Sequence, residues 1–181
     1  MYIRELTRDE IPLVWAIDRR EVIDGIYVVQ NGELVLRPEH FDVHGWPPGE
    51  AEKYTPILTD CFDRGGAFFG AFEADRLVGV AVLESAFIGK DADQLQLKFL
   101  QVSRENRGHG LGRLLFELSA RRAKELGAKR LYISATPSQH TVEFYLRLGC
   151  FPAAEPDPEL YALEPDDIHL GYGLADDRSV P

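Results

Sequence analysis

The sequence predicts an α/β fold in which strands and helices alternate along 181 residues. An apolar, strand-like run over residues 95–102 passes through a glycine-rich turn into a leucine-rich helix. A second strand, turn and helix occupy residues 131–149, and Gly149 closes that helix. Two pairs of β-rich runs, over residues 25–36 and 67–84, are each divided by a short turn and indicate hairpins.

The chain is expected to begin with a strand and a capped helix. Residues 2–6 have a strand-like composition, and Thr7 with Glu10 forms a capping box ahead of an apolar run. Because a proline is tolerated only in the first turn of a helix, Pro12 leaves Asp9 as an alternative cap.

A hairpin and an irregular loop are predicted next. The dipeptide Asn31-Gly32 between two β-rich runs is a strong signal for a tight hairpin turn. Residues 41–50 hold His44, Trp46 and two prolines, so we expect them to form a loop without regular structure. Two interpretations of Trp46 stay open, since its side chain could cover the core or contact a substrate.

The middle of the chain fits a helix over residues 50–64, ended by Gly65-Gly66, and then an antiparallel sheet. Strands are expected over residues 67–73 and 76–84, followed by a looser stretch over residues 85–93. The next strand leads into the glycine-rich turn.

That turn carries glycines at three alternating positions, Gly108, Gly110 and Gly112. Glycine permits backbone angles closed to other residues, and it leaves space for a ligand to approach the main chain. Free amides at the start of the following helix, together with the helix dipole, favour an anion there. We therefore predict a pyrophosphate-binding loop. The residues expected to bind are Arg107, Gly108, His109, Gly110, Leu111, Gly112 and Arg113.

The spacing excludes two familiar phosphate-binding loops. A Walker loop ends in Gly-Lys-Ser/Thr, whereas Gly112 is followed by Arg113 and Leu114. The dinucleotide fingerprint requires a third glycine where this chain has Arg113 or Leu115. Nucleoside triphosphate hydrolysis and dinucleotide binding are therefore not expected.

The remaining pattern, Arg107-x-x-Gly110-x-Gly112, resembles the signature Gln/Arg-x-x-Gly-x-Gly/Ala of the GNAT superfamily of N-acetyltransferases. The resemblance implies a mixed, mostly antiparallel central sheet flanked by helices, with the hairpin as an addition between the first two helices. It implies acetyl-CoA as the co-substrate, bound through its pyrophosphate. It also implies that main-chain groups of Leu100, Gln101 and Val102 bind the pantetheine arm and polarise the thioester carbonyl.

A second segment is similar to the other coenzyme motif of that family, Asn-x-x-Ala-x-x-x-Tyr-x-x-x-Gly-Phe. This chain has Ser138, Thr141, Tyr145, Gly149 and Cys150 at those positions, so the tyrosine and the glycine match. The resemblance implies that the Tyr145 hydroxyl lies near the thioester sulfur and protonates the departing thiolate. Ser138 stands where the family has an asparagine that contacts the pantetheine arm.

The general base is harder to assign. Gln94 and Gln96 occupy strand positions where a carboxylate would be convenient, and glutamine does not accept a proton at neutral pH. Glu84, at the end of the preceding strand, is the first candidate. The further candidates are Glu21, Asp24 and His44.

Later segments are expected to complete the core. The helix after the glycine loop should bury one leucine-rich face, and Gly127 should end it. Closing strands are expected over residues 160–163 and 168–170. The leucines assigned to the buried face are Leu111, Leu114, Leu115, Leu118 and Leu126.

Length and charge limit the function classes. A chain of this size suits one domain, expected over residues 1–175 with an insertion over residues 25–48 and a frayed tail over residues 176–181. With 30 acidic and 20 basic residues, the net charge is −10, which opposes nucleic acid as a main ligand. The acidic residues near the C-terminus have two interpretations, a solvated surface or a field that attracts an amine.

Cysteine and histidine usage indicates neither a disulfide framework nor a metal site. The two cysteines lie in unlike contexts, and the five histidines show no metal-ligand spacing. No apolar run approaches the roughly 18 residues of a membrane span, and no cationic, apolar leader is apparent. We therefore expect a cytoplasmic protein without a membrane partner.

Taken together, these features predict an N-acetyltransferase that transfers an acetyl group from acetyl-CoA to a primary amine of a small molecule or protein by direct attack. An alternative is an acetyl-CoA-binding sensor or interaction module with little or no turnover. The exposed edge of the hairpin could close the site or pair two copies as a homodimer.

Overall fold

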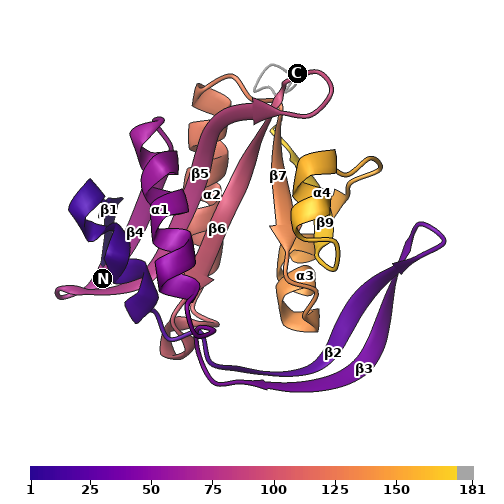
Figure 1. Cartoon of the computed structure of the whole chain (residues 1–181), viewed down its shortest axis with the longest axis horizontal. Coiled ribbons are helices and arrows are strands. Elements are labelled where there is room, and N and C mark those ends of the chain that lie inside the picture. Colours follow the sequence, from indigo (N-terminus) through magenta and orange to yellow (C-terminus); the bar gives the residue numbers. More distant parts are fainter. Residues whose placement is uncertain (175–181) are drawn as a thin grey trace, which may run out of the picture.

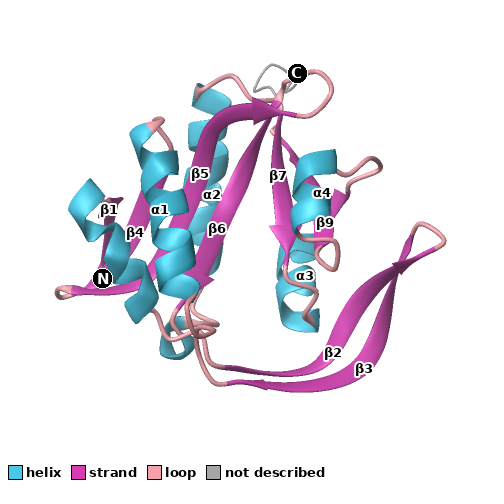
Figure 2. Cartoon of the chain, viewed as in Figure 1, coloured by secondary structure: helices cyan, strands magenta, loops and turns pink. Residues whose placement is uncertain are grey.

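The computed structural model describes residues 1–174, so the predicted frayed tail over residues 176–181 lies outside the described residues. It contains a seven-stranded sheet in the order β1-β4-β5-β6-β7-β9-β8 and a separate two-stranded sheet, β2-β3 (Figures 1 and 2). Within the large sheet only β6 and β7 run parallel. The predicted mixed, mostly antiparallel sheet with an additional hairpin is confirmed.

The first elements are β1 (Tyr2–Glu5) and a 3-10 helix, η1 (Arg8–Ala16). Thr7 caps this helix rather than Asp9, because Glu10 accepts hydrogen bonds from both the amide and the hydroxyl of Thr7. The predicted capping box is therefore present.

The additional hairpin consists of β2 (Glu21–Gln30) and β3 (Glu33–Val43). Asn31 and Gly32 both adopt positive φ, 51° and 81°, as a tight turn between twisted strands requires. Residues 41–43 were expected in a loop, and this was wrong because they continue the strand pairing, with Val43 opposite Glu21. Loop residues then lead to α1 (Glu50–Asp63).

Next come β4 (Ala67–Glu73), β5 (Arg76–Ile88) and β6 (Gln94–Val102). Residues 85–88 were predicted to be loose, but they extend β5 because Phe87 and Ile88 pair with the start of β6. Side chains of β5 alternate between the two faces of the sheet. Val80 and Val82 pack with η1 and α1, whereas Ala81 and Leu83 pack with the helix that follows the glycine loop.

The second half contains α2 (Leu111–Glu125), β7 (Arg130–Ala135), α3 (Gln139–Arg147) and β8 (Phe151–Pro152). Leu111 and Leu115 of α2 are buried, whereas Leu114 and Leu126, the residue just beyond the helix, are 46% and 47% exposed. The assignment of those last two leucines to the core was therefore wrong.

The last elements are α4 (Pro158–Leu163) and β9 (Ile168–Gly173). The strand predicted over residues 168–170 is present, but residues 160–163 are helical. The reason is local, because the Asp157 carboxylate accepts the amides of Glu159 and Leu160, and Pro158 has the backbone angle that suits a first helical turn. No helix within residues 1–174 combines the length and apolarity needed to cross a membrane.

The large sheet opens between its two parallel strands. β6 pairs with β7 only over Gln94–Gln96, and beyond that point the strands diverge (Figure 1). On its other edge, β6 has a bulge at Lys98, because Leu97 and Phe99 pair with the consecutive residues Leu83 and Val82. A bulge bends the strand that carries it, and here it lies where β6 departs from β7.

The two adjacent leucines of α2 give a matched test of this packing. Leu115→Ala should lower the free energy of unfolding by about 2–5 kcal/mol, because it leaves a cavity in the core. Leu114→Ala should change it by less than about 0.5 kcal/mol, because that side chain is largely exposed. Chemical denaturation of the two variants measures the difference, and equal losses would contradict the orientation of α2.

Candidate active site

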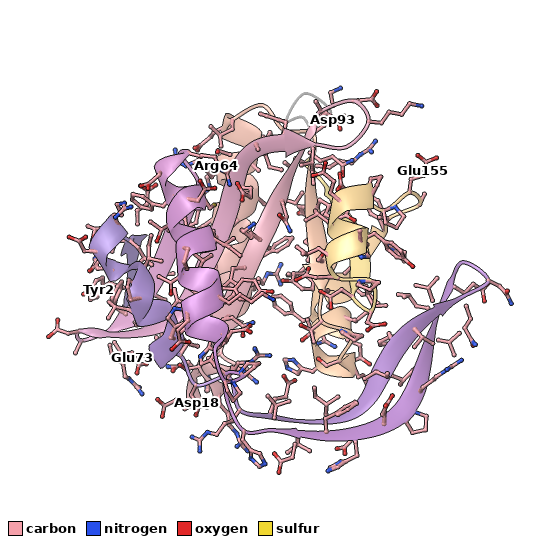
Figure 3. The ribbon with its side chains drawn as sticks, viewed as in Figure 1. Tyr2, Asp18, Arg64, Glu73, Asp93 and Glu155 are labelled. Carbon is pink, nitrogen blue, oxygen red and sulfur yellow. The ribbon has the colours of Figure 1, made fainter. Side chains whose placement is uncertain are left out.

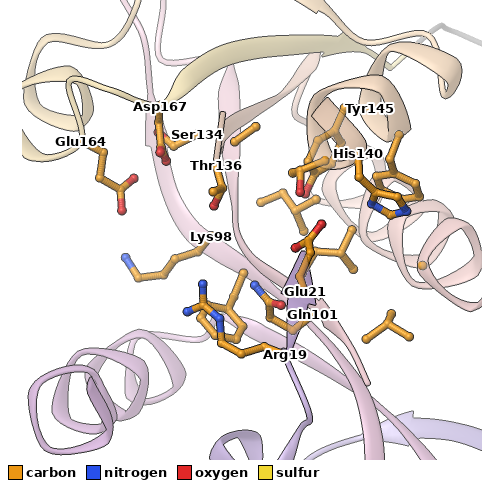
Figure 4. Close-up of a pocket in the computed structure, with 18 of the residues that line it drawn as sticks. Arg19, Glu21, Lys98, Gln101, Ser134, Thr136, His140, Tyr145, Glu164 and Asp167 are labelled. Carbon is orange, nitrogen blue, oxygen red and sulfur yellow. The ribbon is translucent and has the colours of Figure 1, made fainter. Parts of the chain in front are cut away.

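A cavity of about 600 Å³ lies where β6 and β7 diverge (Figure 4). Its walls come from β6, β7, α1 and the additional hairpin, from the glycine loop and α3, and from the segment between α4 and β9. The site therefore combines residues from both halves of the chain.

The glycine loop presents free amides to this cavity. Gly108 and Gly110 have φ of 78° and 84°, and the space where their side chains would stand is open. The first hydrogen bond of the helix joins the Leu114 amide to the Gly110 carbonyl at 3.0 Å. None of the hydrogen bonds among residues 1–174 uses an amide of residues 108–113. An anion at this position would therefore meet unpaired donors.

The predicted loop contacts separate into two groups. Gly108, Gly110, Gly112 and Arg113 line the cavity. The side chain of Leu111 is instead buried in the core, and that of His109 is exposed outside the lining. Leu111 can therefore contribute only its main-chain amide to the binding of an anion.

Arg107 lines the cavity, and its side chain binds the end of β6. Its Nε donates to the Val102 carbonyl at 2.9 Å, and its Nη1 lies 3.8 Å from the Glu21 carboxylate. Burial lowers the pKa of Arg107 from its ordinary value, although the Glu21 carboxylate opposes that shift. The side chain thus ties the glycine loop to β6 and to the first residue of β2.

The residues expected to meet the thioester also lie at this cavity. Leu100, Gln101 and Val102 line it from β6, at positions where that strand no longer pairs with β7. Gln101 is directed into the cavity between Lys98 and Glu21 (Figure 4). The main chain of β6 is therefore accessible along the edge that faces β7.

Tyr145 lines the cavity from α3 and is 6% exposed. Its hydroxyl makes no hydrogen bond to any of residues 1–174, while its ring packs against Phe116 and Phe144. Burial raises the pKa of Tyr145, and nearby Cys150 and Asp167 raise it further. The hydroxyl therefore keeps its proton across the neutral range and is available to donate a hydrogen bond.

Ser138 does not line the cavity and is 2% exposed. It is the N-cap of α3, where its Oγ accepts from the Thr141 amide at 3.3 Å and donates to Thr141 Oγ1 at 2.9 Å. Thr141 does line the cavity. A side-chain contact from this turn to a ligand is thus open to Thr141 rather than to Ser138.

Glu84 lies outside the cavity lining. Its carboxylate accepts from both Nη atoms of Arg64 at 3.1 Å and lies 3.1 Å from Lys98 Nζ. Burial would raise the pKa of Glu84, but the hydrogen bonds and charges of Arg64 and Lys98 outweigh it and hold the pKa below its ordinary value. This arrangement does not favour Glu84 as a proton acceptor and instead positions Lys98, which lines the cavity.

The other candidate bases are dispersed. The side chains of Asp24 and His44 are 78% and 84% exposed, and Asp24 pairs with His40 on the hairpin. Glu21 alone of the three lines the cavity. No group of His, Cys, Asp and Glu within residues 1–174 is arranged to hold a metal ion.

Asp167 and Glu164 were not among the predicted site residues, yet both line the cavity and point into it (Figure 4). Burial raises the pKa of Asp167 to about 7, and the neighbouring Glu164 and Asp166 contribute. The available signal was the clustering of carboxylates between residues 155 and 167, which also fits a solvated surface.

A buried hydrogen-bond network holds the segment that carries these acids. Tyr132 Oη lies 2.7 Å from His169 Nδ1 and accepts the Asp157 amide at 2.9 Å. His169 Nε2 lies 3.2 Å from the Glu164 carbonyl oxygen. With Nε2 protonated, His169 donates to Glu164 and accepts from Tyr132, so β7 and β9 fix both ends of the α4 segment.

Trp46 covers the core, and its contact with a substrate stays a prediction. Its ring stacks on Phe99 with centroids 5.8 Å apart and meets Trp15 edge to face at 4.9 Å. Its Nε1 donates to the Ile17 carbonyl at 2.9 Å. The same side chain lines the cavity and therefore both covers the core and bounds the site.

Comparison with family models supplies the identification. Residues 32–150 match the model of the Acetyltransferase (GNAT) family. The chain belongs to this acetyltransferase family. The matched segment includes the diverging strands β6 and β7 and the glycine loop. Comparison of the sequence with curated proteins gave no significant match.

Solved structures with the same fold include a nourseothricin acetyltransferase, with 20% identity, a TM-score of 0.70, and coverage of 96% of this chain and 98% of that one. A putative streptothricin acetyltransferase from Bacillus anthracis in complex with acetyl coenzyme A has 14% identity, a TM-score of 0.68, and coverage of 97% and 98%. PaiA N-acetyltransferase from Thermoplasma acidophilum in complex with coenzyme A has 15% identity, a TM-score of 0.62, and coverage of 95% and 98%.

The two ends of α2 provide a matched test of the glycine loop. Gly110 and Gly127 both have positive φ and open space around the position of a Cβ. Replacing either with valine should cost about 1–2 kcal/mol of stability through backbone strain. Only Gly110→Val should also weaken coenzyme A binding, by about tenfold or more, because its side chain stands between the amides and the ligand. Isothermal titration measures this, and equal affinities would remove the loop from the site.

Proposed function

We propose that this acetyltransferase transfers an acetyl group from acetyl-CoA to a primary amine of a small molecule. The observation that carries the proposal is the cavity between β6 and β7, which has free loop amides at one end and the half-buried carboxylates of Glu164 and Asp167 at the other. An anionic donor and a cationic acceptor could thus enter from opposite ends and be held together within one cavity, and direct transfer requires this proximity.

In this proposal the pyrophosphate of acetyl-CoA meets the amides of residues 108–113, and the pantetheine arm runs along the free edge of β6. Main-chain groups of Leu100, Gln101 and Val102 orient the arm and polarise the thioester carbonyl. The neutral amine attacks the carbonyl carbon, the carbon–sulfur bond breaks, and the nitrogen loses a proton while the sulfur leaves as a thiolate.

Asp167 is proposed to accept the proton of the acceptor amine. It lines the cavity, and because its pKa is about 7, both the protonated and the ionised forms of Asp167 are populated near neutral pH. Tyr145 is proposed to donate a hydrogen bond to the thiolate. Because the pKa of Tyr145 is raised, complete transfer of its proton to a thiolate whose conjugate thiol has an ordinary pKa near 8.5 is uphill, so the role proposed for Tyr145 is stabilisation through the hydrogen bond.

The additional hairpin favours a small acceptor over a protein chain. Glu21, Ile23 and Val43 from this hairpin line the cavity, and the Tyr27 amide bonds to the Pro137 carbonyl at 2.8 Å, which ties the hairpin to the turn before α3. Two of the solved structures with the same fold are named as acetyltransferases of nourseothricin and streptothricin, which supports a small-molecule acceptor.

The direct test incubates the protein with acetyl-CoA and a panel of small primary amines and follows the release of free thiol. A rise in thiol that depends on the amine, with a product heavier by one acetyl group, is expected. Binding of acetyl-CoA without thiol release from any amine would contradict the proposal and favour a coenzyme-binding module.

Tyr145→Phe tests the role of the hydroxyl. It should lower kcat by roughly a hundredfold and leave the affinity for acetyl-CoA nearly unchanged, because the ring and its packing stay in place. The control is Tyr161→Phe on α4, whose parent residue is 50% exposed. Steady-state kinetics separate the outcomes, and unchanged kcat would remove Tyr145 from the mechanism.

Asp167→Asn tests the proton acceptor through a pH profile. The kcat/KM of the unmodified protein should fall as the pH drops below about 7, since Asp167 becomes protonated. The variant should lose most of its activity, and its remaining kcat/KM should no longer show this acidic limb, the fall below about pH 7. Asp166→Asn, at the exposed neighbouring position, should keep the limb with a slightly lower midpoint because one nearby negative charge is gone.

The same variant should be more stable than the unmodified protein at alkaline pH. The pKa of Asp167 is higher in the folded chain than in the unfolded chain, so ionisation above about 7 costs stability. Asparagine avoids that cost, and Tm should rise on the order of a few degrees at alkaline pH but not below the unfolded pKa near 4. A lower Tm at alkaline pH would indicate that the carboxylate is stabilising.

A further inference from the structure

A second, smaller cavity of about 360 Å³ adjoins the first on the acceptor side. Gln96 and Leu160 belong to the walls of both cavities, so the two hollows meet at these side chains. The second cavity is bounded by Arg64 at the end of α1, by the end of β5, and by Asp157 and Glu159 around the start of α4.

Gln96 stands unpaired at the junction. The residue is 8% exposed, and its side-chain amide makes no hydrogen bond to any of residues 1–174. Within residues 1–174, Oδ1 of Asn106 is the single side-chain polar atom that is both fully buried and without a hydrogen bond. The side-chain amide atoms of Gln96 are therefore not fully buried. The remaining surface of the Gln96 amide therefore faces the two cavities. A buried amide without partners is costly unless a ligand or water completes its hydrogen bonds.

The wall formed by α4 and its flanks is strongly acidic. Residues 155–167 contain six carboxylates and no lysine or arginine. Asp157 and Glu159 line the second cavity, whereas Glu164 and Asp167 line the first. Within residues 1–174, no lysine, arginine or histidine pairs with any of these four carboxylates. The two cavities thus share one continuous acidic side.

The cations near the second cavity are already neutralised. Both Nη atoms of Arg64 donate to Glu84, and its Nε donates to Asp60. Lys98 also pairs with Glu84. These two cations and two carboxylates balance each other. Within residues 1–174, the carboxylates of the second cavity that have no cationic partner are Glu159 and Asp157, the latter also capping α4.

From these contacts we infer that the acceptor carries a second cationic group besides the amine that is acetylated. The second group binds where the cavities meet, between the Gln96 amide and the carboxylates of Glu159 and Asp157, while the reacting amine lies beside Asp167. The acceptor class is an extended diamine or polyamine, and the inference depends on the proposed function for the identity of the reacting end.

The test measures binding to the protein saturated with coenzyme A, so that its outcome does not depend on turnover. Isothermal titration compares α,ω-diaminoalkanes of increasing length with the ω-amino alcohols and n-alkylamines of the same length. Diamines above a minimum length should bind about fivefold more tightly than either single-cation series, as expected for one additional charge pair at the solvent-accessible rim of a cavity.

Three variants locate the second group. Glu159→Gln should weaken diamine binding about three- to fivefold and leave the n-alkylamines unchanged. Gln96→Leu should weaken it about tenfold, since a hydrogen bond to a charged group is lost. Glu155→Gln is the matched control, because that exposed side chain points to solvent on the same segment (Figure 3) and lines neither cavity.

Equal affinity for diamines and amino alcohols would overturn the inference, as would equal effects of Glu159→Gln and Glu155→Gln. Free-thiol release with acetyl-CoA is measured on the same compounds. The expected binding pattern without thiol release would overturn acetyl transfer and leave the second subsite standing. Thiol release from all amines without the pattern would overturn the subsite alone.

Discussion

The divergence of β6 from β7 is the constraint on which the rest of the site depends. Parallel pairing ends at Gln96, and the bulge at Lys98 lies where β6 turns away from its neighbour. The N–H and C=O groups on a strand edge need hydrogen-bond partners. Leaving them without partners in a closed interior would lower the stability of the fold. Here the unpaired edge borders a cavity, and the glycine loop that leads into α2 follows the end of the same strand. The accessible main chain and the free amides are therefore two results of one backbone path.

Charge divides this cavity into two ends. The glycine loop contributes N–H groups and Arg113, whereas the segment after α4 contributes Glu164 and Asp167. Keeping a carboxylate in that position costs stability, which is expressed in the raised pKa of Asp167. The hydrogen bonds of His169 hold the segment in place against that cost. Ionisable groups with shifted pKa values are common at functional sites.

Features encoded by local sequence were predictable. The positive φ of Asn31 and the glycine loop both follow from residue types at fixed positions. Residues 160–163 were misassigned because a short apolar run fits either a strand or a helix, although Asp157 and Pro158 supplied the helical signal.

Features that depend on distant partners were not predictable. Glu84 was predicted to end a strand, but it lies within β5, and its partner Arg64 precedes it by 20 residues, at the end of another element. Asp167 was hidden among other acids whose pattern also suits a solvated surface. Its burial depends on how α4 packs beside β7 and β9, which no local pattern encodes. Leu114 and Leu126 similarly share the leucine spacing of α2 without facing the sheet.

The central claim is that unpaired amides of residues 108–113 hold the diphosphate of the coenzyme at the opening between β6 and β7. The most direct measurement is a titration of the ¹⁵N-labelled protein with coenzyme A, followed through the amide resonances of the chain. The account predicts large shifts for the amides of this loop and little change for the amide of Gly127 at the far end of α2. Unshifted loop amides at saturating coenzyme would contradict it.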